Sequence, residues 1–353
     1  MHKKILFLIN GEGLGNSTRC HAIIQKLLKK NVKIILVLAK NSYWYFAQKK
    51  LPVEIFVIDQ FSYHISKDGH LSTYKTLFKT FASISLFYKN LNKIKEIIKS
   101  FKPNIIISDS NYIFNFFKKF NIPTLALNNS CITVDEYQNQ LKKPPSIKQH
   151  YYFIEKLDYF YHKTFPDLTI SCGITHKEDK IHKNFKNVSP IYRENLKVKQ
   201  DEKKKTCMIM LSGASNLKSF IDLSFIDDEI IFLNKPDYIK ENKNTKFVSK
   251  VHDNIEYLNK ADYFIINSGY SAISEAIFMK KPMITMPINN HSEQWLNAKK
   301  VEDKNYGLLA NLSNLEEKYK EFSTNFSYYR ASLNNKENEI NGSEEIADLL
   351  MKF

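Results

Sequence analysis

The chain has 353 residues, 43% of them hydrophobic and 25% charged, and its 52 basic and 37 acidic side chains leave a net charge of +15. The length predicts two domains of ordinary size, and the apolar content excludes a disordered chain. No apolar run is long enough for a membrane-spanning helix. Four isolated cysteines without a C-x-x-C spacing favour a reducing cytoplasm over disulfides or zinc.

The positive charge has three interpretations. Abundant lysine, asparagine and isoleucine indicate a coding bias that scatters lysines over solvent-facing surfaces. The alternative is an anionic partner, either a lipid surface or a phosphorylated sugar donor. Nucleic acid is the least favoured partner, because no zinc-finger or RNP-type motif is present and the basic residues form no single tract. We therefore expect a cytoplasmic protein that binds no nucleic acid, with peripheral contact to the inner, anionic face of a membrane left open.

The first half of the chain alternates between β-rich runs and helical patterns. Strands are predicted at 4–9, 33–38, 54–58, 104–108 and 124–127, and helices at 18–30, 42–50, 71–99 and 112–120. This rhythm predicts βαβ units and a parallel sheet covered on both faces. The segment 137–165 is interpreted as a connection plus a helix, and a strand follows at 168–171.

The rhythm restarts after the charged run 197–205, which we interpret as a solvated linker. Strands are predicted at 206–211, 229–233, 246–248, 263–266 and 282–286, and helices at 216–224, 255–260, 271–279, 292–303 and from Ser343 onward. The predicted fold is α/β, with two Rossmann-like doubly wound domains that face a cleft at the carboxyl ends of their strands. We expect an N-terminal domain over 1–165, a C-terminal domain over 166–335, and a C-terminal helix in 336–353 that could pack back on the first domain.

The stretch "INGEGLGNSTR" places three of the nine glycines in one turn between a strand and a helix. The spacing differs from the dinucleotide fingerprint G-x-G-x-x-G, and the second strand ends Leu38-Ala39-Lys40 without the expected ribose-binding acid. A phosphate loop ending in G-K-[ST] is also absent. Backbone N–H groups at a helix N-terminus suit a phosphate or a close-lying sugar. The alternative is a tight turn that requires positive φ.

A second constellation lies in 261–307. A predicted strand ends at Asn267, the turn 268–271 opens a helix, and Glu275 follows four residues after Ser271 on the same helix face. The N-terminus of such a helix can hold a diphosphate, and a carboxylate one turn further on can accept hydrogen bonds from two ribose hydroxyls. Glu275 could equally be a solvated helix residue.

This stretch resembles the nucleotide-sugar half of GT-B glycosyltransferases, especially those similar to glycosyltransferase family 28, which includes the N-acetylglucosaminyltransferase of peptidoglycan synthesis. The shared pattern is a Gly-rich turn, a helix with Glu-Ala, then K-P-x-x-x-x-P and E-Q-x-x-N-A, which 271–276, 281–287 and 293–298 match in order. The stretches "GEGLGNSTR", "KPNIIISDSN", "IPTLALNNS", "SPIYR" and "MLSGAS" resemble the same group. The resemblance implies transfer from a nucleotide-sugar, UDP-linked in our reading, to a glycolipid or polysaccharide precursor.

The resemblance also implies a role for each matched residue. Glu275 would hold the ribose, Arg193 would stabilise the diphosphate leaving group, and Gly213 would line the donor pocket. Glu293 and Gln294 would bond sugar hydroxyls. Gly13 and Gly15 would let the substrates approach the backbone. The residues that would present donors to the diphosphate are Ser268, Gly269, Tyr270 and Ser271.

Transfer in this group inverts the anomeric centre without a metal, and the chain has no Asp-x-Asp motif. We therefore expect no metal and no cofactor besides the sugar nucleotide. Cleavage of the glycosyl–phosphate bond leaves about two negative charges on the nucleoside diphosphate, and a helix dipole, backbone N–H groups and an arginine can stabilise them.

The sequence departs from the family pattern at two positions. Asn16 stands at the catalytic position usually held by His, and asparagine accepts a proton poorly, so Asp109 at a predicted strand end is the first candidate for the general base. Asp109 could instead cap the helix that follows. Tyr270 stands where small residues are usual, so it either alters donor choice or stacks on a ring.

Two further alternatives stay open. The amphipathic pattern in 71–99 predicts either a core-facing helix or a lipid-facing surface for a lipid-linked acceptor. The same donor pocket would also serve a nucleotide-sugar hydrolase or epimerase, or a non-catalytic nucleotide-sugar-binding protein.

Overall fold

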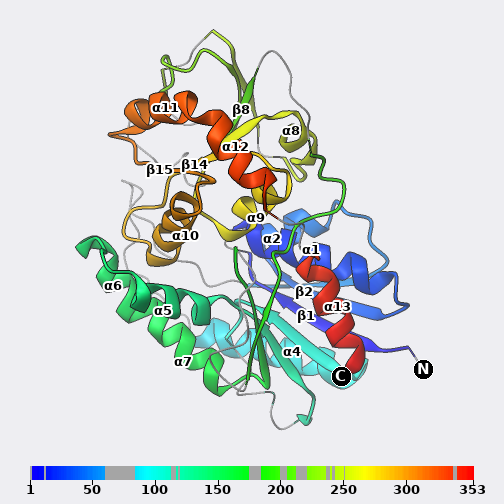
Figure 1. Cartoon of the computed structure of the whole chain (residues 1–353). Coiled ribbons are helices and arrows are strands. Elements are labelled where there is room, and N and C mark those ends of the chain that lie inside the picture. Colours follow the sequence, from blue (N-terminus) through cyan, green and yellow to red (C-terminus); the bar gives the residue numbers. More distant parts are fainter. Residues whose placement is uncertain are drawn as a thin grey trace.

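The computed structural model describes residues 2–11, 13–59, 84–112, 117, 120–174, 184–198, 205–211, 221–235, 239–240, 243–249, 251–336 and 340–353. Two parallel sheets dominate these residues, one in each half of the molecule (Figure 1). The first sheet has seven strands in the order β3-β2-β1-β4-β5-β6-β7, and the second has six in the order β12-β10-β8-β13-β14-β15. The predicted pair of doubly wound α/β domains is confirmed.

The first sheet is built from short, apolar, β-branched runs. Its strands are β1 (Lys4–Ile9), β2 (Lys33–Ala39), β3 (Glu54–Ile58), β4 (Ile105–Asp109), β5 (Thr124–Leu127), β6 (Leu168–Cys172) and β7 (Phe185–Val188). Alternate residues of β1 face opposite layers. Ile5 and Phe7 join the core under α1 (Leu14–Leu28), whereas Leu6 and Leu8 join the core under α4 (Ile84–Phe101). Both faces of the sheet are therefore buried, as a parallel sheet requires.

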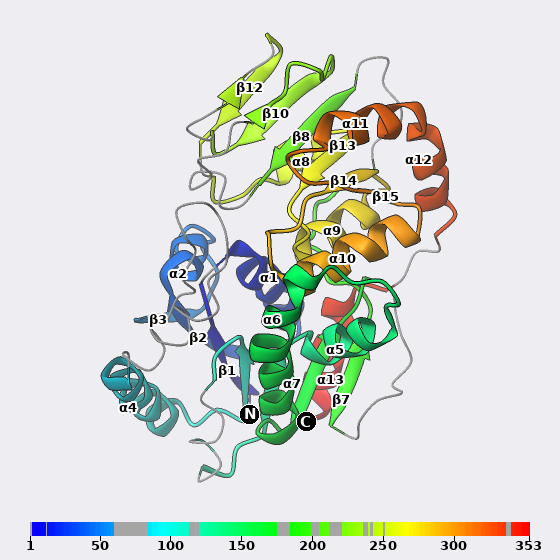
Figure 2. The ribbon, with the colours of Figure 1, turned by 90° about the vertical axis from the view of Figure 1, so that its left-hand side faces the viewer.

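Several further helices of the first half are described. They are α2 (Lys40–Phe46), α5 (Ser130–Asn139), the 3₁₀ turn η3 (Pro145–Ile147), α6 (Lys148–His150), the π-helical stretch η4 (Tyr151–Glu155) and α7 (Lys156–Thr164). Of these, α2, α5 and η4 contact the second half. Figure 2 shows α6 directly beneath α10 of the second half.

The second sheet comprises β8 (Thr206–Met210), β10 (Glu229–Leu233), β12 (Thr245–Val248), β13 (Tyr263–Ile266), β14 (Met283–Thr285) and β15 (Gly307–Leu309). One face packs on α11 (Leu315–Thr324) and α12 (Phe326–Asn334) through Tyr263 and Phe322. The other face carries α8 (Ile255–Lys260), α9 (Tyr270–Phe278) and α10 (Ser292–Asp303). A separate two-stranded sheet pairs β9 (Ile221–Asp222) with β11 (Ile239–Lys240).

Several elements differ from the expectation. Residues 221–222 of the predicted helix 216–224 form β9, and 216–220 lie outside the described residues. Residues 71–83 of the predicted helix 71–99, and most of the predicted helix 112–120, lie outside them as well. The strands β7 and β15 and the helix α5 were not predicted, because their apolar residues follow neither a clear helical nor a clear strand period. The helices α11 and α12 were not predicted either, although their buried residues recur at helical spacing.

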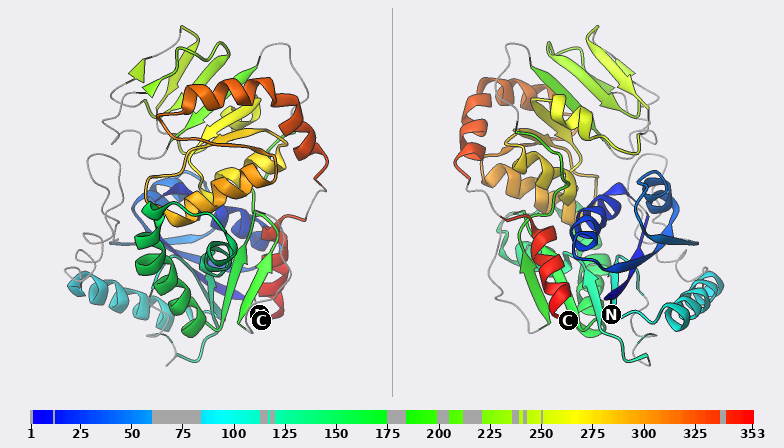
Figure 3. Two further views of the ribbon diagram at one scale, coloured as in Figure 1. Left: turned by 60° about the vertical axis from the view of Figure 1, so that its left-hand side comes forward. Right: turned by 90° about the vertical axis from the view of Figure 1, so that its right-hand side faces the viewer.

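The strands β6 and β7 pair within the first sheet, although the expected boundary at 165–166 precedes them. The chain changes sheet between Val188 and Thr206. It returns at the end, because α13 (Gly342–Lys352) lies beside α1 (Figure 3). Lys26 pairs with Glu344 at 2.9 Å and Lys30 with Asp348 at 2.7 Å. None of the described helices is long and apolar enough to cross a membrane.

Candidate functional site

The N-termini of α1 and α9 meet where the two halves face each other. The Ser271 hydroxyl, in the first turn of α9, donates a hydrogen bond to the Gly15 carbonyl in the first turn of α1 at 3.1 Å. Neither helix has a side-chain N-cap or an acidic residue in its first turn. The N–H groups of both first turns therefore give this place a positive potential, and anions are favoured there.

The glycines of the opening turn serve three different purposes. Among the described glycines only Gly307 has a positive φ. The alternative prediction, that the turn contains glycines because its backbone requires positive φ, is therefore wrong. A Cβ on Gly11 would lie 1.9 Å from the Ala39 carbonyl oxygen, so Gly11 permits a close backbone approach. A Cβ on Gly15 would touch Ser271, at 3.4 Å from its hydroxyl. Gly13 adjoins open space, as does Gly269 at the start of α9, so both leave room for a ligand.

The side chains of Ser268 and Tyr270, which were predicted to bind the diphosphate, are buried inside the protein. Ser268 is fully buried, and its hydroxyl has no hydrogen-bond partner among the described residues, while its carbonyl accepts from Asn297 at 3.1 Å. The Tyr270 hydroxyl donates to the Gly173 carbonyl of the first half at 2.8 Å, and burial raises the pKa of this phenol. Tyr270 therefore bridges the two halves of the protein through this hydrogen bond.

Arg193 and Glu275 face each other in the interface. The Arg193 guanidinium donates to both carboxylate oxygens of Glu275, at 2.6 and 2.8 Å, and also to Asn254 at 2.7 Å and Asp253 at 3.2 Å. Burial opposes the charge of Arg193, yet Glu275 holds its pKa above the usual value. Four contacts of the guanidinium thus go to protein groups, and the alternative that Glu275 is a solvated helix residue is wrong, since it is 5% exposed.

Arg19 and Asp109 form a second buried pair. Asp109, at the carboxyl end of β4, accepts hydrogen bonds from Arg19 at 2.6 and 2.9 Å and is fully buried. Burial opposes the Arg19 charge, and Asp109 nonetheless keeps the arginine pKa well above its usual value. A buried carboxylate whose two oxygens both accept hydrogen bonds from a guanidinium is poorly placed to take a proton from an acceptor hydroxyl.

The remaining predicted site residues lie around the same interface. Asn16 is half-buried in the first turn of α1. Glu293 is half-buried in the first turn of α10, and burial raises the pKa of its carboxyl. The Gln294 side-chain oxygen accepts from the Ile288 N–H at 2.9 Å and so fixes the loop before α10. Gly213 lies outside the described residues.

Further contacts close the interface on the side of α2. The Trp44 ring stacks on His252 with centroids 3.7 Å apart, and Lys49 pairs with Asp253 at 2.5 Å. The His21 Nδ1 lies 2.9 Å from the Tyr45 hydroxyl, and burial lowers the His21 pKa to about 4. The structure thus gives His21 a partner within its own half.

On the side of α10, histidines and acids gather at the seam. The His150 Nδ1 lies 2.8 Å from the Ser292 hydroxyl and 3.3 Å from a Glu155 carboxylate oxygen. The rings of His150 and His291 are 4.5 Å apart. Burial and then the nearby Glu293 raise the pKa of Glu155 well above its usual value.

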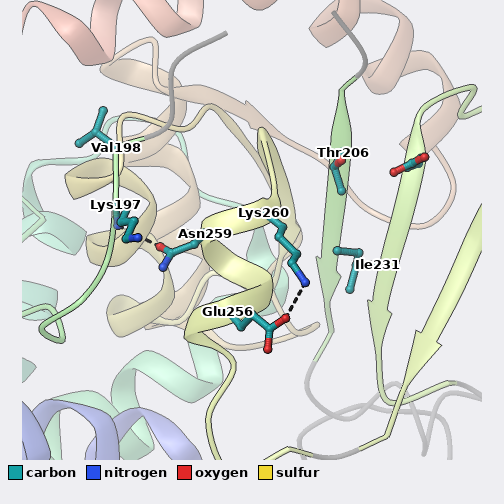
Figure 4. Close-up of a pocket in the computed structure, with 8 residues that line it drawn as sticks. Lys197, Val198, Thr206, Ile231, Glu256, Asn259 and Lys260 are labelled. Atoms are coloured by element: carbon teal, nitrogen blue, oxygen red, sulfur yellow. Dashed lines mark hydrogen bonds and ion pairs between the residues drawn. The ribbon is translucent and has the colours of Figure 1, made fainter. Parts of the chain in front are cut away.

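A cavity of about 580 Å³ lies elsewhere, on the second domain between α8, β8 and β10 (Figure 4). The Lys197 N–H donates to the Asn259 side chain at 2.9 Å at its edge, and Lys260 pairs with Glu256. None of the predicted site residues lines this cavity.

Sequence reasoning missed several residues that build the interface, namely Arg19, Tyr45, Asp253 and Asn254. Arg19 belongs to the quoted glycine stretch, and an arginine on the same helix face as Cys20, Ile23 and Leu27 was the available signal. Asp253 and Asn254, which accept hydrogen bonds from Arg193, carried no such signal, because they lie 60 and 61 residues further along the chain.

The fold and these helix N-termini define the class of protein. MurG of Acinetobacter baumannii has the same fold, with a TM-score of 0.60 and 13% identity over 99% of this chain and all of that chain. So does the Streptomyces sp. SF2575 glycosyltransferase SsfS6 complexed with thymidine diphosphate, with a TM-score of 0.61 and 9% identity over the full length of both. The expected GT-B glycosyltransferase fold is confirmed.

The sequence places the chain within that class. An uncharacterized glycosyltransferase of Methanosarcina mazei is 24% identical over 343 residues, which cover 88% of this chain and 86% of the relative. Residues 3–326 match the model of glycosyl transferase family 1. The chain belongs to glycosyl transferase family 1, and it is a glycosyltransferase.

Proposed function

We propose that the enzyme takes its sugar from a nucleoside diphosphate donor whose diphosphate lies between the N-termini of α1 and α9. The observation that carries this proposal is their direct contact, Ser271 to Gly15 at 3.1 Å, beside the open space at Gly13 and Gly269. Two uncapped helix ends that converge from two domains favour a group with several negative charges. A diphosphate leaving group carries such charge, so the same N–H groups stabilise it as the sugar departs.

Glu275 is proposed to hold the ribose, and Arg193 to position Glu275 instead of contacting the diphosphate. The bidentate pair uses one acceptor site on each carboxylate oxygen, and the second site of each stays available for a ribose hydroxyl. Glu293 and Gln294, at the start of α10, are proposed to face the donor sugar. The base is a pyrimidine in this proposal, with UDP as the first choice, and the thymidine diphosphate in SsfS6 supports that class.

Transfer is proposed to invert the anomeric centre and to need no metal at the reacting atoms. The helix ends supply the charge stabilisation that a cation would otherwise supply. The buried Arg19–Asp109 pair is given a positioning role beneath α1, because both Asp109 oxygens accept from Arg19. Asn16, in the first turn of α1, then lies beside the proposed acceptor hydroxyl.

The acceptor is proposed to be a glycolipid or a lipid-linked polysaccharide precursor. The described part of the helix predicted at 71–99 is α4, and its Leu91, Ile94 and Ile98 are buried in the core. A different surface supports membrane contact. Phe153 of η4 and Leu157 and Phe160 of α7, together called the α7 stripe, are 55%, 57% and 68% exposed. Lysines flank this apolar stripe, which fits an anionic lipid surface.

Calorimetric titration with UDP tests the proposed nucleotide site. In Gly269→Asp a carboxylate stands at the N-terminus of α9, so UDP affinity should fall by about tenfold or more. Asn314→Asp is the matched control, because it places the same carboxylate at the N-terminus of α11, on the opposite face of the second sheet from α9, and keeps the oxygen that accepts from the Asn311 N–H. Equal UDP affinity in Gly269→Asp and the wild type would contradict the proposal.

The acceptor is tested by incubation with UDP-sugars and a lipid extract. Sugar recovered on lipid supports transfer to a glycolipid. Free sugar without an acceptor would favour the hydrolase, an altered nucleotide-sugar would favour the epimerase, and binding without turnover would favour a non-catalytic protein.

A further inference from the structure

We propose that His150, Glu155 and His291 bind a divalent transition-metal ion, with Zn²⁺ as the best-fitting ion, at the seam between the two domains. The three side chains offer two imidazole nitrogens and one carboxylate oxygen, all within 4.8 Å of one another. His291 lies two residues before Glu293, which is proposed to face the donor sugar, and the proposed role of the metal is to join the two domains.

The backbone brings the first two ligands together by an uncommon device. His150 precedes the π-helical stretch η4, and Glu155 ends it, five residues further on. In an α-helix, residues five apart point in clearly different directions. In a π-helix, whose hydrogen bonds run from i to i+5, they lie one above the other, and such stretches occur often at functional sites. His150 Nδ1 and the Glu155 oxygen are 3.3 Å apart as a result.

That separation suits a bound ion. Two ligand atoms at about 2.0–2.1 Å from a tetrahedral Zn²⁺ are roughly 3.3 Å apart. The third ligand comes from the second domain, since His291 is the N-cap residue of α10. Its ring is half-buried, and a ring nitrogen lies within 4.8 Å of the ligand atoms of both His150 and Glu155.

The surroundings indicate which cation fits. Two nitrogen ligands disfavour Mg²⁺ and Ca²⁺, which prefer oxygen, and the set of two His and one Glu matches known zinc sites. The cluster is enclosed, because His150 is 3% exposed and Glu155 is 6% exposed. The Ser292 hydroxyl lies 2.8 Å from His150 Nδ1 and 3.5 Å from the Glu155 oxygen. It is therefore a polar group close enough to serve as the fourth ligand.

Binding there would fasten the two domains. His150 and Glu155 lie on the segment that follows α5 in the first half, and His291 lies on the loop between β14 and α10 in the second. An ion pair already joins the domains nearby, because Lys300 of α10 pairs with Glu136 of α5 at 2.5 Å. An ion that binds the folded interface and not the unfolded chain stabilises the fold by mass action.

Titration of the full-length, chelator-treated protein with Co²⁺ tests the proposal, because Co²⁺ reports its ligands through its visible absorption. We expect one Co²⁺ per chain with a tetrahedral spectrum, displacement by Zn²⁺, and a higher melting temperature with Zn²⁺. His291→Ala should lose the stoichiometric binding and the thermal shift. The His291 Nδ1 also accepts from the Gln294 N–H at 3.4 Å and so caps α10. His291→Asn keeps an acceptor at the cap, so it should fold and should also lose the Co²⁺ spectrum.

His252→Ala is the matched control, because His252 also lies at the domain interface but stacks on Trp44. It should keep the Co²⁺ spectrum, and Glu155→Gln should lose it. An absent spectrum in the wild type, or one that persists in both His291→Ala and Glu155→Gln, would overturn the metal site. The UDP titration is independent of this result, so the metal site and the proposed function can fail separately.

Discussion

The Arg193 guanidinium and the Glu275 carboxylate form a bidentate ion pair that is buried between the two domains. The two N···O distances are 2.6 and 2.8 Å. Both groups come from motifs that the sequence assigned to the nucleotide, and each is the other's principal partner. A buried pair of this kind is more costly to break than to replace whole. Its proposed purpose is to hold Glu275 in one orientation for the ribose.

Replacement of Arg193 by Lys should weaken UDP binding, because an ammonium cannot form the bidentate pair that orients Glu275. Arg193→Ala should in addition lower the free energy of unfolding by about 3–5 kcal/mol, since Glu275 is left as an unpaired buried charge. Denaturant unfolding and calorimetry with UDP measure the two effects. Wild-type UDP affinity in a folded Arg193→Lys enzyme would contradict the positioning role.

The Arg19–Asp109 pair gives a test of the general base. Asp109→Asn should lower the free energy of unfolding by about 3–5 kcal/mol, because Arg19 loses its charged partner while 9% exposed. The measurement is denaturant unfolding beside a transfer assay. If the variant keeps wild-type stability and yet transfers no sugar, Asp109 is the base after all.

The opening glycines should differ sharply in tolerance. Gly11→Ala should destabilise the fold severely, because its Cβ would lie 1.9 Å from a backbone oxygen. Gly13→Ala should leave stability nearly unchanged, since that Cβ would enter open space, and should weaken UDP binding instead. Thermal melting with and without UDP separates the two effects. Equal melting temperatures for both variants would contradict the close-approach explanation.

Replacement of all three residues of the α7 stripe by Ser should reduce sedimentation with anionic phosphatidylglycerol vesicles and leave the melting temperature within a few degrees. The reason is that these side chains are more than half exposed and contribute little to the core. Tyr328→Ser on α12, 55% exposed, is the control and should not change vesicle binding. Undiminished sedimentation of the triple variant would place any membrane contact elsewhere.

The buried His21 should make stability depend on pH. Burial lowers its pKa from 6.5 to about 4, so below about pH 6.5 the unfolded chain binds a proton that the folded chain does not. The free energy of unfolding should therefore decrease as the pH falls from about 6.5 to 4, by about 3 kcal/mol from this group. His21→Gln should show a flatter dependence over that window in denaturant unfolding. Parallel curves for the two proteins would refute this.

Much of the fold followed from local pattern. The runs that became β1, β3, β5, β10 and β13 have the predicted bounds, because short apolar β-branched runs between turn residues have few alternatives. The strand β7 escaped prediction, since FKNV shows no alternation and owes its place to pairing with β6. The helix α5 was missed because its burial comes from α7 and α10 and not from a helical period.

The sequence by itself determined that the turns after the parallel strands of the two domains face one interface, because the carboxyl ends of parallel strands meet at one edge of a sheet. Which groups bond to which was decided only by the tertiary structure. Arg193 pairs with Glu275, Tyr270 with Gly173 and Arg19 with Asp109 across 82, 97 and 90 residues of chain. A side chain's nearest partner depends on how two domains pack, and no local pattern in the sequence encodes that distance.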